Sequence, residues 1–470
     1  MPCSRSLGSS LLAALAAVLS AGAPALAATF TVDTTTDAVD ATPGDHQCRT
    51  AGNLCSLRAA VQEANALPGL DAVDLPAGTY ALSLAGAGED AGLTGDLDVT
   101  DDLTLTGAGE GLTILDAAGL DRFFDHHPGR LGTTLWLITL SVRNGATSGS
   151  GANGGCFLNP EGGQLLFDRV TVSDCRGMAF GGAVFNGGRF EAVDSSLIGN
   201  GDPTLDSTFG GAIATVGANA ELFLLLSEVR GNQASNAGAI FVSADFKTPH
   251  DSEVRIEHSS LVGNTVRQSG GAIYNFSLTP VYIEDSTISG NQAGMGGGLF
   301  NDGGGRFHIR NSTITANHAQ TIGGGISEVH VDDQFIRVRN SIIAGNTAGS
   351  MGPDCAFRMS SDGGTLLGNS SSCQMTSIGG DLIDVNPLLG QLVPIGPRSW
   401  GHRLLDGSPA IDSGANALCS PDDQVLTPRP LDGDGNGVAI CDIGAIESAG
   451  EIFRSGFETG NISEWSFAVP

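Results

Sequence analysis

The sequence predicts an all-β protein, a single-stranded right-handed parallel β-helix (solenoid) with a short N-terminal capping helix. A motif that closes on asparagine returns six times at steps of 26–32 residues, and a small-residue pair followed by an aliphatic returns out of phase with it. Apolar and polar residues alternate within each copy, as at Ile283 and Glu284, which indicates strands. Because a propeller blade needs about 40 residues, this repeat fits one coil of a stacked solenoid.

The asparagines that close the copies have a structural interpretation. Asn tolerates the left-handed turn region, and its amide can donate to the next coil and accept from the previous one. We therefore expect a hydrogen-bonded ladder at one corner of the coil, with ligand binding as the alternative. Glycine pairs, as in Gly270-Gly-Ala-Ile273, are expected to supply positive φ and close backbone approach at another corner. The ladder asparagines are Asn200, Asn232, Asn264, Asn291, Asn317 and Asn346.

The net charge and the N-terminal residues limit the classes of binding partner and the cellular location that we expect. The net charge is −29 with Lys247 as the single lysine, which argues against nucleic acid and anionic membrane surfaces as partners. Residues 1–27 are expected to be a cleaved signal peptide, with Arg5 before an apolar run and Ala25-Leu26-Ala27 at the cleavage site. No later apolar run reaches the roughly 18 residues of a membrane span. We expect a secreted protein, extracellular or at the outer-membrane surface, with no transmembrane span in the mature chain.

Export permits disulfides, and the eight cysteines after the signal peptide fall into sequence-local couples. Eight cysteines allow 105 connectivities, among which nearest-neighbour pairing is expected. A zinc site would need tighter spacing and nearby histidines. The expected couples are Cys48/Cys55, Cys156/Cys175, Cys355/Cys373 and Cys419/Cys441.

Residues 28–96 are expected to form the N-terminal cap. Apolar residues from Leu57 to Ala64 follow a helical spacing, so a short amphipathic helix is expected to cover the open end of the column. The stretch Cys55-Ser-Leu-Arg-Ala-Ala60 resembles the CSLREA motif of secreted bacterial β-helix proteins. Ala59 stands where that motif has Glu, so a pairing of this Glu with Arg58 is absent.

Two further resemblances extend along the chain. The expected β-helix of residues 97–350 resembles the repeats of the polymorphic outer-membrane protein family, which pair a Gly-Gly-Ala-Ile element with a Phe-x-x-Asn element. The first element matches at Gly210 and Gly270, and an aliphatic replaces the Phe of the second, as in Leu261-Val-Gly-Asn264. Residues 351–448, expected to hold closing coils, contain Leu405-Asp-Gly-Ser-Pro-Ala-Ile-Asp-Ser-Gly414 and resemble the choice-of-anchor region of bacterial surface β-helix proteins. Residues 449–470 form a tail that resembles short C-terminal tags on exported proteins of some Gram-negative bacteria.

Catalytic carboxylates in β-helix polysaccharide enzymes need basic partners. Neither Asp101-Asp102 nor Asp332-Asp333 has such a partner in sequence, so the sequence provides no catalytic set. An outward column is more informative: it is expected to be either a solvated face or a groove for an acidic glycan or protein. In a second, neighbouring column, Glu284 is expected to pair with Arg310 on the next strand. The first column, the possible groove, consists of Arg255, Tyr282, His308 and Arg337.

A partly aromatic stripe follows the glycine pairs. If the preceding aliphatics face inward, the stripe points outward and can stack on sugar rings or a partner. In the opposite register it is an internal aromatic stack. The stripe consists of Phe185, Ala214, Phe241, Tyr274, Phe300 and Ser327.

Calcium is the one cofactor that the sequence suggests. Asp432, Asp434 and Asn436 alternate with glycines, as in the start of a calcium loop. Ile443 occupies the twelfth position, where such a loop carries Glu, so Asp442 or a backbone carbonyl is expected to complete the shell. The alternative is a simple Asp/Gly turn.

Together these observations predict an exported bacterial β-helix protein that acts as a cell-surface or secreted binding and adhesion module rather than as an enzyme. Its expected partners are a glycan or a host or cell-surface protein. The alternative is a polysaccharide lyase or glycoside hydrolase on a pectate-lyase-like β-helix. A structural component of the envelope without a ligand is a third interpretation, because one scaffold hosts many functions.

Overall fold

The computed structural model describes residues 27–127, 132–149, 152–205, 208–244, 252–329 and 336–449. The predicted signal peptide and C-terminal tail, apart from one residue of each, lie outside these ranges. Within the described residues, no helix is both long enough and apolar enough to cross a membrane.

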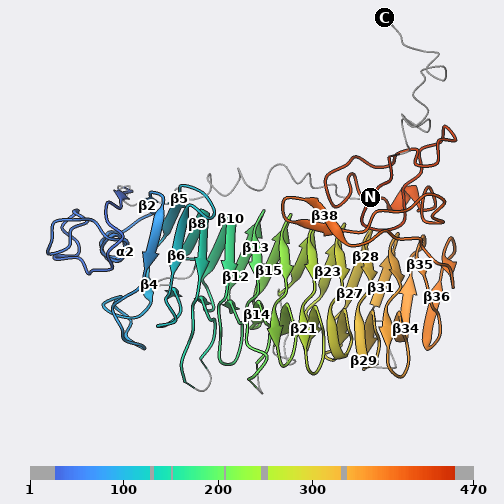
Figure 1. Ribbon diagram of the computed structural model, residues 1–470, viewed down its shortest axis with the longest axis horizontal. Helices are drawn as coiled ribbons and strands as arrows, with labels where there is room; N and C mark the ends of the chain where they lie inside the picture. The colour runs from blue at the N-terminus through green and yellow to red at the C-terminus, as the bar shows by residue number, and fades with distance from the viewer. Residues whose placement is uncertain are drawn as a thin grey trace, which may run out of the picture.

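The described chain forms a right-handed parallel β-solenoid of about nine turns with one α-helix, which confirms the predicted fold class. The coils stack along the long axis of the molecule (Figure 1). A repeating coil contributes one strand to each of three faces, and each strand pairs in parallel with its equivalent in the next coil.

The first face carries the longer strands of the coils. After β1 (Thr29–Thr31), it consists of β2 (Asp71–Leu75), β5 (Leu103–Gly107), β8 (Thr134–Arg143), β10 (Gln164–Ser173), β12 (Arg189–Val193), β15 (Glu221–Leu225), β19 (Val254–Glu257), β23 (Val281–Glu284), β27 (Phe307–Arg310), β31 (Ile336–Arg339), β34 (Cys355–Ser361) and β36 (Cys373–Ser377).

The second face follows after a sharp corner, and β8 and β10 continue across that corner into it. Its other strands are β3 (Gly78–Ala81), β6 (Thr113–Asp116), β13 (Ser196–Ile198), β16 (Glu228–Arg230), β20 (Ser260–Val262), β24 (Thr287–Ser289), β28 (Thr313–Thr315), β32 (Ile342–Ala344), β35 (Leu366–Leu367) and β37 (Leu382–Ile383).

The third face begins after the glycine pairs, and a short side ladder lies between the second and third faces in sequence. The third face consists of β4 (Leu97–Val99), β7 (Phe124–His126), β9 (Phe157–Asn159), β11 (Val184–Asn186), β14 (Ile213–Val216), β18 (Ile240–Ser243), β22 (Ile273–Asn275), β26 (Leu299–Asn301) and β30 (Ile326–Glu328). The side ladder consists of β17 (Gln233–Ala234), β21 (Thr265–Val266), β25 (Gln292–Met295), β29 (His318–Ile322) and β33 (Thr347–Ala348).

The core is a column of side chains that the strand alternation turns inward. Ile283 and Ile309 have no exposed surface, whereas Glu284 and Arg310, one position later, are partly exposed on the outside. The same alternation repeats in every copy that the sequence analysis identified. It leaves a thin core that suits a chain with few bulky residues.

The six predicted asparagines form the expected ladder at the corner after the second face. From Asn200 to Asn317, each side-chain amide donates to Oδ1 of the next asparagine at 2.9–3.0 Å. Asn346 donates to Asp354 at 2.8 Å, so a carboxylate that no repeat motif marks closes the ladder. The ladder is buried and therefore belongs to the scaffold.

One part of the corner prediction is wrong. The residue with positive φ precedes each asparagine, as at Gly263 (φ 65°) and Gly290 (φ 67°), and the ladder asparagines themselves lie outside the left-handed region. Hydrogen bonding alone therefore explains the asparagines. The glycine pairs behave as expected: Gly270 has φ 72°, and a Cβ on Gly271 would collide with the carbonyl oxygen of Gly297.

The disulfides join the cysteines that are neighbours in sequence, as predicted. They are Cys48–Cys55, Cys156–Cys175, Cys355–Cys373 and Cys419–Cys441. Disulfides of this kind indicate folding outside the reducing cytoplasm.

Cys175 has a second role that the sequence analysis missed. Strand register continued from Ser173 and Ile198 places Cys175 at the ladder position one coil before Asn200. Its backbone N–H donates to Oδ1 of Asn200 at 3.0 Å, as the ladder asparagines do to one another. Its side chain has no exposed surface and bonds to the equally buried Cys156 instead of continuing the ladder. The prediction treated Cys175 only as half of a disulfide, whereas it also marks the N-terminal end of the asparagine ladder.

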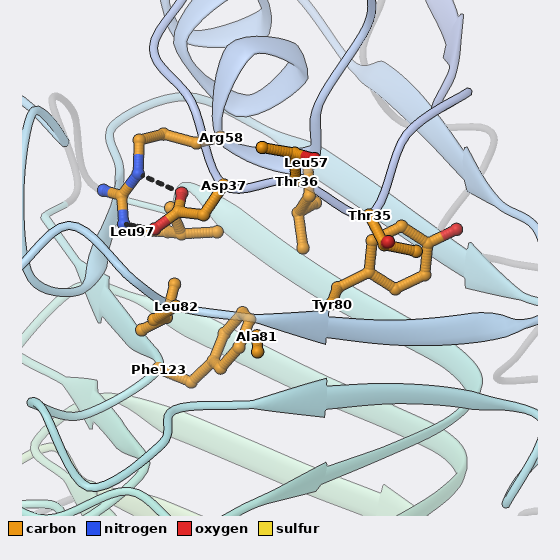
Figure 2. Close-up of a pocket in the computed structure, with 10 residues that line it drawn as sticks. All are labelled: Thr35, Thr36, Asp37, Leu57, Arg58, Tyr80, Ala81, Leu82, Leu97 and Phe123. Atoms are coloured by element: carbon orange, nitrogen blue, oxygen red, sulfur yellow. Dashed lines mark hydrogen bonds and ion pairs between the residues drawn. The ribbon is translucent and has the colours of Figure 1, made fainter.

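The cap helix α2 (Leu57–Ala66) lies at the N-terminal end of the solenoid (Figure 1). Ser56 caps it, because its Oγ accepts the N–H of Ala59 at 3.1 Å. Arg58 is buried and pairs with Asp37 at 2.7 Å (Figure 2). Asp37 thus provides the carboxylate that the CSLREA comparison left missing beside this arginine.

After the last coils, residues 384–448 fold back along the second face and carry the hairpin β38 (Val393–Gly396) and β39 (Ser399–Gly401), followed by the 3₁₀ turn η1 (Asn416–Leu418). Figure 1 shows this C-terminal segment in orange and red beside the stacked strands. Trp400 donates from Nε1 to Glu228 at 3.0 Å, and Ala445 donates its N–H to Thr313 at 3.0 Å. The segment therefore covers much of the second face.

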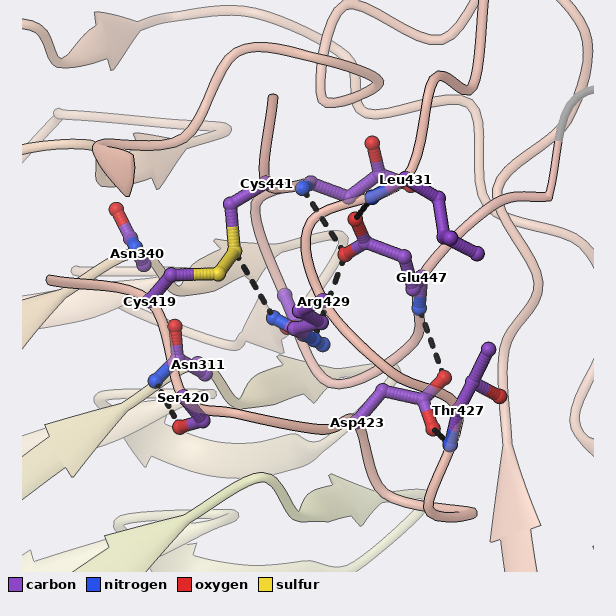
Figure 3. Close-up of polar contacts among 12 residues, drawn as sticks. Asn311, Asn340, Cys419, Ser420, Asp423, Thr427, Arg429, Leu431, Cys441 and Glu447 are labelled. Atoms are coloured by element: carbon purple, nitrogen blue, oxygen red, sulfur yellow. Dashed lines mark hydrogen bonds and ion pairs between the residues drawn. A yellow bond between two sulfur atoms is a disulfide. The ribbon is translucent and has the colours of Figure 1, made fainter. Parts of the chain in front are cut away.

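Buried polar contacts hold this segment together (Figure 3). Arg429 and Glu447 have no side-chain exposure, and Nε of Arg429 lies 3.4 Å from Glu447. Arg429 also donates to the carbonyl of Gly444 at 2.8 Å. Asn311 ties the segment to the solenoid by donating to Ser420 at 2.6 Å.

Candidate functional site

The outer surface of the first face carries the most distinctive exposed side chains. Strand register places Arg255, Tyr282, His308 and Arg337 beside one another on β19, β23, β27 and β31, as the sequence analysis expected. The Arg255 guanidinium lies 4.6 Å from the centre of the Tyr282 ring. The Tyr282 and His308 rings stack at 4.8 Å with planes 10° apart. We call these four residues the stacked column.

The neighbouring column on the same face is charged. Arg310 donates to Glu284 at 2.8 Å, which is the pair that the sequence predicted. Arg339 lies next to Arg310 in register, and its Nε has no hydrogen-bond partner among the described residues. Burial, followed by the charge of Arg310, lowers the pKa of Arg339. Within the described residues, Nε of Arg339 is therefore free to bond to a ligand.

The electrostatics of the stacked column favour a neutral imidazole. Burial lowers the pKa of His308 to about 4, and the charges of Arg310, Arg337 and Arg306 act in the same direction. His308 is therefore uncharged at neutral pH and presents a flat aromatic surface. Arginines thus gather at one end of the first face on a protein whose net charge is −29.

This arrangement suits recognition better than catalysis. Aromatic and guanidinium planes at the strand spacing of about 4.8 Å give a row of flat surfaces for ring stacking. Arginine also binds carboxylates with two parallel hydrogen bonds. A ligand with rings and carboxylates would contact both features.

The aromatic stripe points away from the main core, yet it is not a free surface. Phe241 and Phe300 are 3% exposed and belong to a second, small core outside the coil. Phe180 and Phe209, which stack at 5.2 Å, pack against this cluster from neighbouring loops. Neither sequence interpretation is right as it stood, because the stripe faces outward but is covered by its own chain.

In the predicted calcium loop, Asp412 is an additional candidate ligand, and Asp442 is no longer one. Asp432 and Asp434 lie with Asp412, and the three carboxylates each offer an oxygen within 4.8 Å of the others. Asp442 does not join them, because its oxygens accept the N–H groups of Asp412 and Ser448. In the loop itself, Asn436 accepts the N–H of Val438 with its side-chain oxygen.

The structure describes one of the two acidic pairs that the sequence analysis weighed for catalysis. Asp332-Asp333 lies outside the described residues. Asp101 and Asp102 accept the backbone N–H groups of Gly69 and Thr134, respectively. Both carboxylates therefore help to position neighbouring backbone segments.

Sequence reasoning missed the residues whose importance comes from their surroundings. Asp412 lies 20 residues before Asp432, so no loop motif contains both. The repeat period did align Arg339 with Glu257, Glu284 and Arg310, and only the unpartnered Nε of Arg339 had no signal in the sequence.

The sequence was compared with protein-family models and with curated proteins. No protein-family model matches the sequence, and no curated protein matches it significantly.

Proposed function

We propose that the protein is an exported bacterial β-helix protein that binds an acidic glycan, at the cell surface or after secretion, through the outer surface of the first face. The supporting observation is the stacked column beside the partner-deficient Arg339. Sugar rings stack on Tyr282 and His308, while uronate carboxylates pair with the flanking arginines. An adhesive role for the whole module follows from this binding.

Local charge supports an acidic ligand over a neutral one. The chain as a whole repels polyanions, so a site for one needs a concentrated patch of arginine. Arg306, Arg310, Arg337 and Arg339 provide this patch. After burial, the charges of Arg310, Arg337 and Arg306 lower the pKa of His308, and the charge of Arg310 lowers the pKa of Arg339. Glu284 pairs with Arg310, and Asp362 pairs with Arg337. Counted over the described residues, the patch therefore keeps an excess of positive charge.

Titration calorimetry with the mature chain tests the proposal. An oligogalacturonate should bind, and a neutral glucan of equal length should not. Tyr282→Ala and Arg337→Ala should each weaken binding about tenfold or more, which corresponds to about 1.4 kcal/mol. Arg189→Ala is the matched control, because Arg189 lies on the same face outside the patch and already pairs with Glu221.

The alternative functions give different results. Cleavage of the oligogalacturonate during the titration would favour the polysaccharide enzyme. Equal binding by the wild type, Tyr282→Ala and Arg337→Ala would move the site elsewhere. If no member of an acidic-glycan array binds, the proposed ligand class is wrong.

A further inference from the structure

An unexplained acidic group lies at the N-terminal end of the third face. Asp98 on β4 and Asp125 on β7 are register neighbours, and both are buried. Like charges opposite each other destabilise a sheet, and burial strengthens their repulsion. Asp96 and Asp121 are also buried nearby.

Two basic side chains among the described residues reach this group. Arg122 lies 3.3 Å from Asp96 and also contacts Oδ2 of Asp125. His127 places Nε2 at 3.1 Å from Oδ1 of Asp125 and at 3.8 Å from Oδ1 of Asp98. Among the described residues, one arginine and one histidine thus face four buried carboxylates.

In both Asp98 and Asp125, Oδ2 accepts a hydrogen bond, whereas Oδ1 lies in a different environment. Oδ2 of Asp98 accepts the N–H of Gly92 at 2.6 Å, and Oδ2 of Asp125 accepts Arg122. Oδ1 of Asp98 has no hydrogen-bond partner within the described residues, whereas Oδ1 of Asp125 and Nε2 of His127 face each other at 3.1 Å. Asp98 is only 1% exposed, so bulk water does not satisfy its free oxygen. Carboxylates anchored by one oxygen and open at the other resemble metal ligands with their supporting hydrogen bonds.

A third carboxylate approaches from the solvent side. Asp90 places Oδ1 at 3.8 Å from Nε2 of His127, and its side chain is 78% exposed. The ligand atoms of Asp90, Asp98 and His127 lie within 4.8 Å of one another. Asp90 comes from the loop beside the cap, so an ion here would join that loop to β4 and β7.

We propose that Asp90, Asp98 and His127 bind one divalent transition-metal ion, of which zinc fits best. A tetrahedral zinc ion with bonds of about 2.0–2.1 Å separates its ligands by about 3.3 Å. The distances from Nε2 of His127 to Oδ1 of Asp90 and to Oδ1 of Asp98, 3.8 Å each, require only small adjustments. The imidazole nitrogen favours zinc over calcium and magnesium, which prefer all-oxygen shells.

The site is independent of the glycan-binding face and is expected to be structural. Calorimetry of the EDTA-treated mature chain should show one zinc ion bound, with a rise in Tm of about 2 °C or more at saturating zinc. His127→Ala and Asp98→Asn should abolish both effects. Asp90→Asn changes an exposed side chain, so it keeps the fold intact and should weaken zinc binding at least tenfold.

Controls separate this site from other acidic groups. Asp434→Asn alters the cluster near the C-terminus and should leave zinc binding unchanged. Absence of heat and of a Tm rise at millimolar zinc would overturn the proposal. Wild-type zinc binding by both Asp90→Asn and His127→Ala would also overturn it, and tighter binding of calcium than of zinc would refute the role given to His127.

Discussion

The side-chain amide of Asn291 donates to Oδ1 of Asn317 at 2.9 Å and also to the carbonyl of Leu261 at 3.0 Å. Its own Oδ1 accepts both the backbone N–H and the side-chain amide of Asn264, each at 2.9 Å. An asparagine amide has two N–H donors and two acceptor sites, so every one of them is used. Each rung therefore supports the coils before and after it.

Replacement of Asn291 by Ala should destabilise the solenoid. The change removes hydrogen bonds to buried partners on the coils before and after it, and one unsatisfied group costs about 1–3 kcal/mol. We expect the free energy of unfolding in urea to fall by at least that amount. Asn219→Ala, at an exposed asparagine, is the control and should change it by less than about 0.5 kcal/mol. Equal stability of Asn291→Ala and the wild type would contradict the ladder.

The parts of the fold that were predictable are those with a local signal. Alternation at Ile283 and Glu284 is visible in the sequence, and so is the spacing of Asn264 and Asn291. The ends of the ladder were hidden, because Cys175 and Asp354 occupy them without the repeat's asparagine.

The return of the C-terminal segment was equally hidden. Arg398 meets Asp194 across 204 residues, and no pattern in the sequence links the two positions. Contacts of this kind depend on where the last coil ends and on the path of the chain after it.

The candidate site was predictable only as a list of neighbours. The repeat period aligned Tyr282 with His308, and the structure confirms that they stack. Burial decides the rest: it makes His308 neutral, covers Phe241 and leaves Nε of Arg339 without a partner among the described residues. These properties depend on side chains brought in from other coils and loops, which a sequence pattern does not describe.

The buried pair of Arg58 and Asp37 should make the cap sensitive to mutation. Arg58 also donates to the carbonyls of Gly92 and Gly95, so its charge is fully enclosed. Asp37→Ala should cost about 3–5 kcal/mol in chemical unfolding, because it leaves a buried charge uncompensated. The double variant Asp37→Leu, Arg58→Met should be more stable than Asp37→Ala, and the opposite order would contradict this explanation.

The same pair should contribute to acid unfolding. Burial alone would raise the pKa of Asp37, but hydrogen bonds from Arg58, Ser83 and Leu84 outweigh it and lower the pKa below its ordinary value of 3.8. A lowered pKa in the folded state gives stability above pH 3.8 that is lost as the pH falls through the folded value. Asp37→Asn should therefore flatten the fall in Tm below about pH 4. An unchanged acid profile would show that other carboxylates control it.

Removal of the disulfide between Cys419 and Cys441 should loosen the C-terminal segment. The bridge spans 22 residues, and the loop-entropy model gives about 3 kcal/mol for a loop of this size. The double Ser variant should lose about this much stability and become cleavable by protease in residues 384–448. The bridge between Cys48 and Cys55 spans 7 residues, and its removal should cost roughly 1 kcal/mol less.

Mass mapping of the unreduced protein checks the pairing itself. It should recover the peptide that contains Cys156 linked to the one that contains Cys175. A link between Cys156 and Cys355 would contradict the pairing.

Calcium binding by the loop at Asp432 stays a prediction, now with Asp412 as a third carboxylate. Asp412 already accepts the N–H of Asp434 at 2.7 Å, so the two chain segments are held together before an ion arrives. We expect weak binding, with a Kd of about 10⁻⁴–10⁻³ M. Asp412→Asn and Asp434→Ala should abolish the heat and the Tm rise seen with millimolar calcium. Asp74→Asn, at an exposed strand position, is the control. If calcium gives neither signal in the wild type, the loop is only a turn.

The N-terminal acidic group should give the metal-free protein an unusual pH dependence. Burial, with the charges of neighbouring acids, raises the pKa of Asp96 to about 8 and that of Asp98 to about 7. Asp121 and Asp125 also have raised pKa values, because burial outweighs the effect of Arg122. Glu89 and His127 face Asp98 from the adjoining loop and from the end of β7, and His127 opposes the shift.

An acid whose pKa is raised by folding releases its proton first in the unfolded chain, so ionisation favours unfolding. Between the ordinary pKa near 4 and the folded value, each pH unit costs up to about 1.4 kcal/mol per group. The Tm of the EDTA-treated chain should therefore fall from about pH 5 to about pH 8. Asp98→Asn cannot ionise and should make this fall shallower, whereas Asp74→Asn should not. Saturating zinc should reduce the fall most at about pH 8, where the carboxylates are most fully ionised and bind the ion best. A Tm that is constant over this pH range in the metal-free wild type would show that the buried acids ionise without cost.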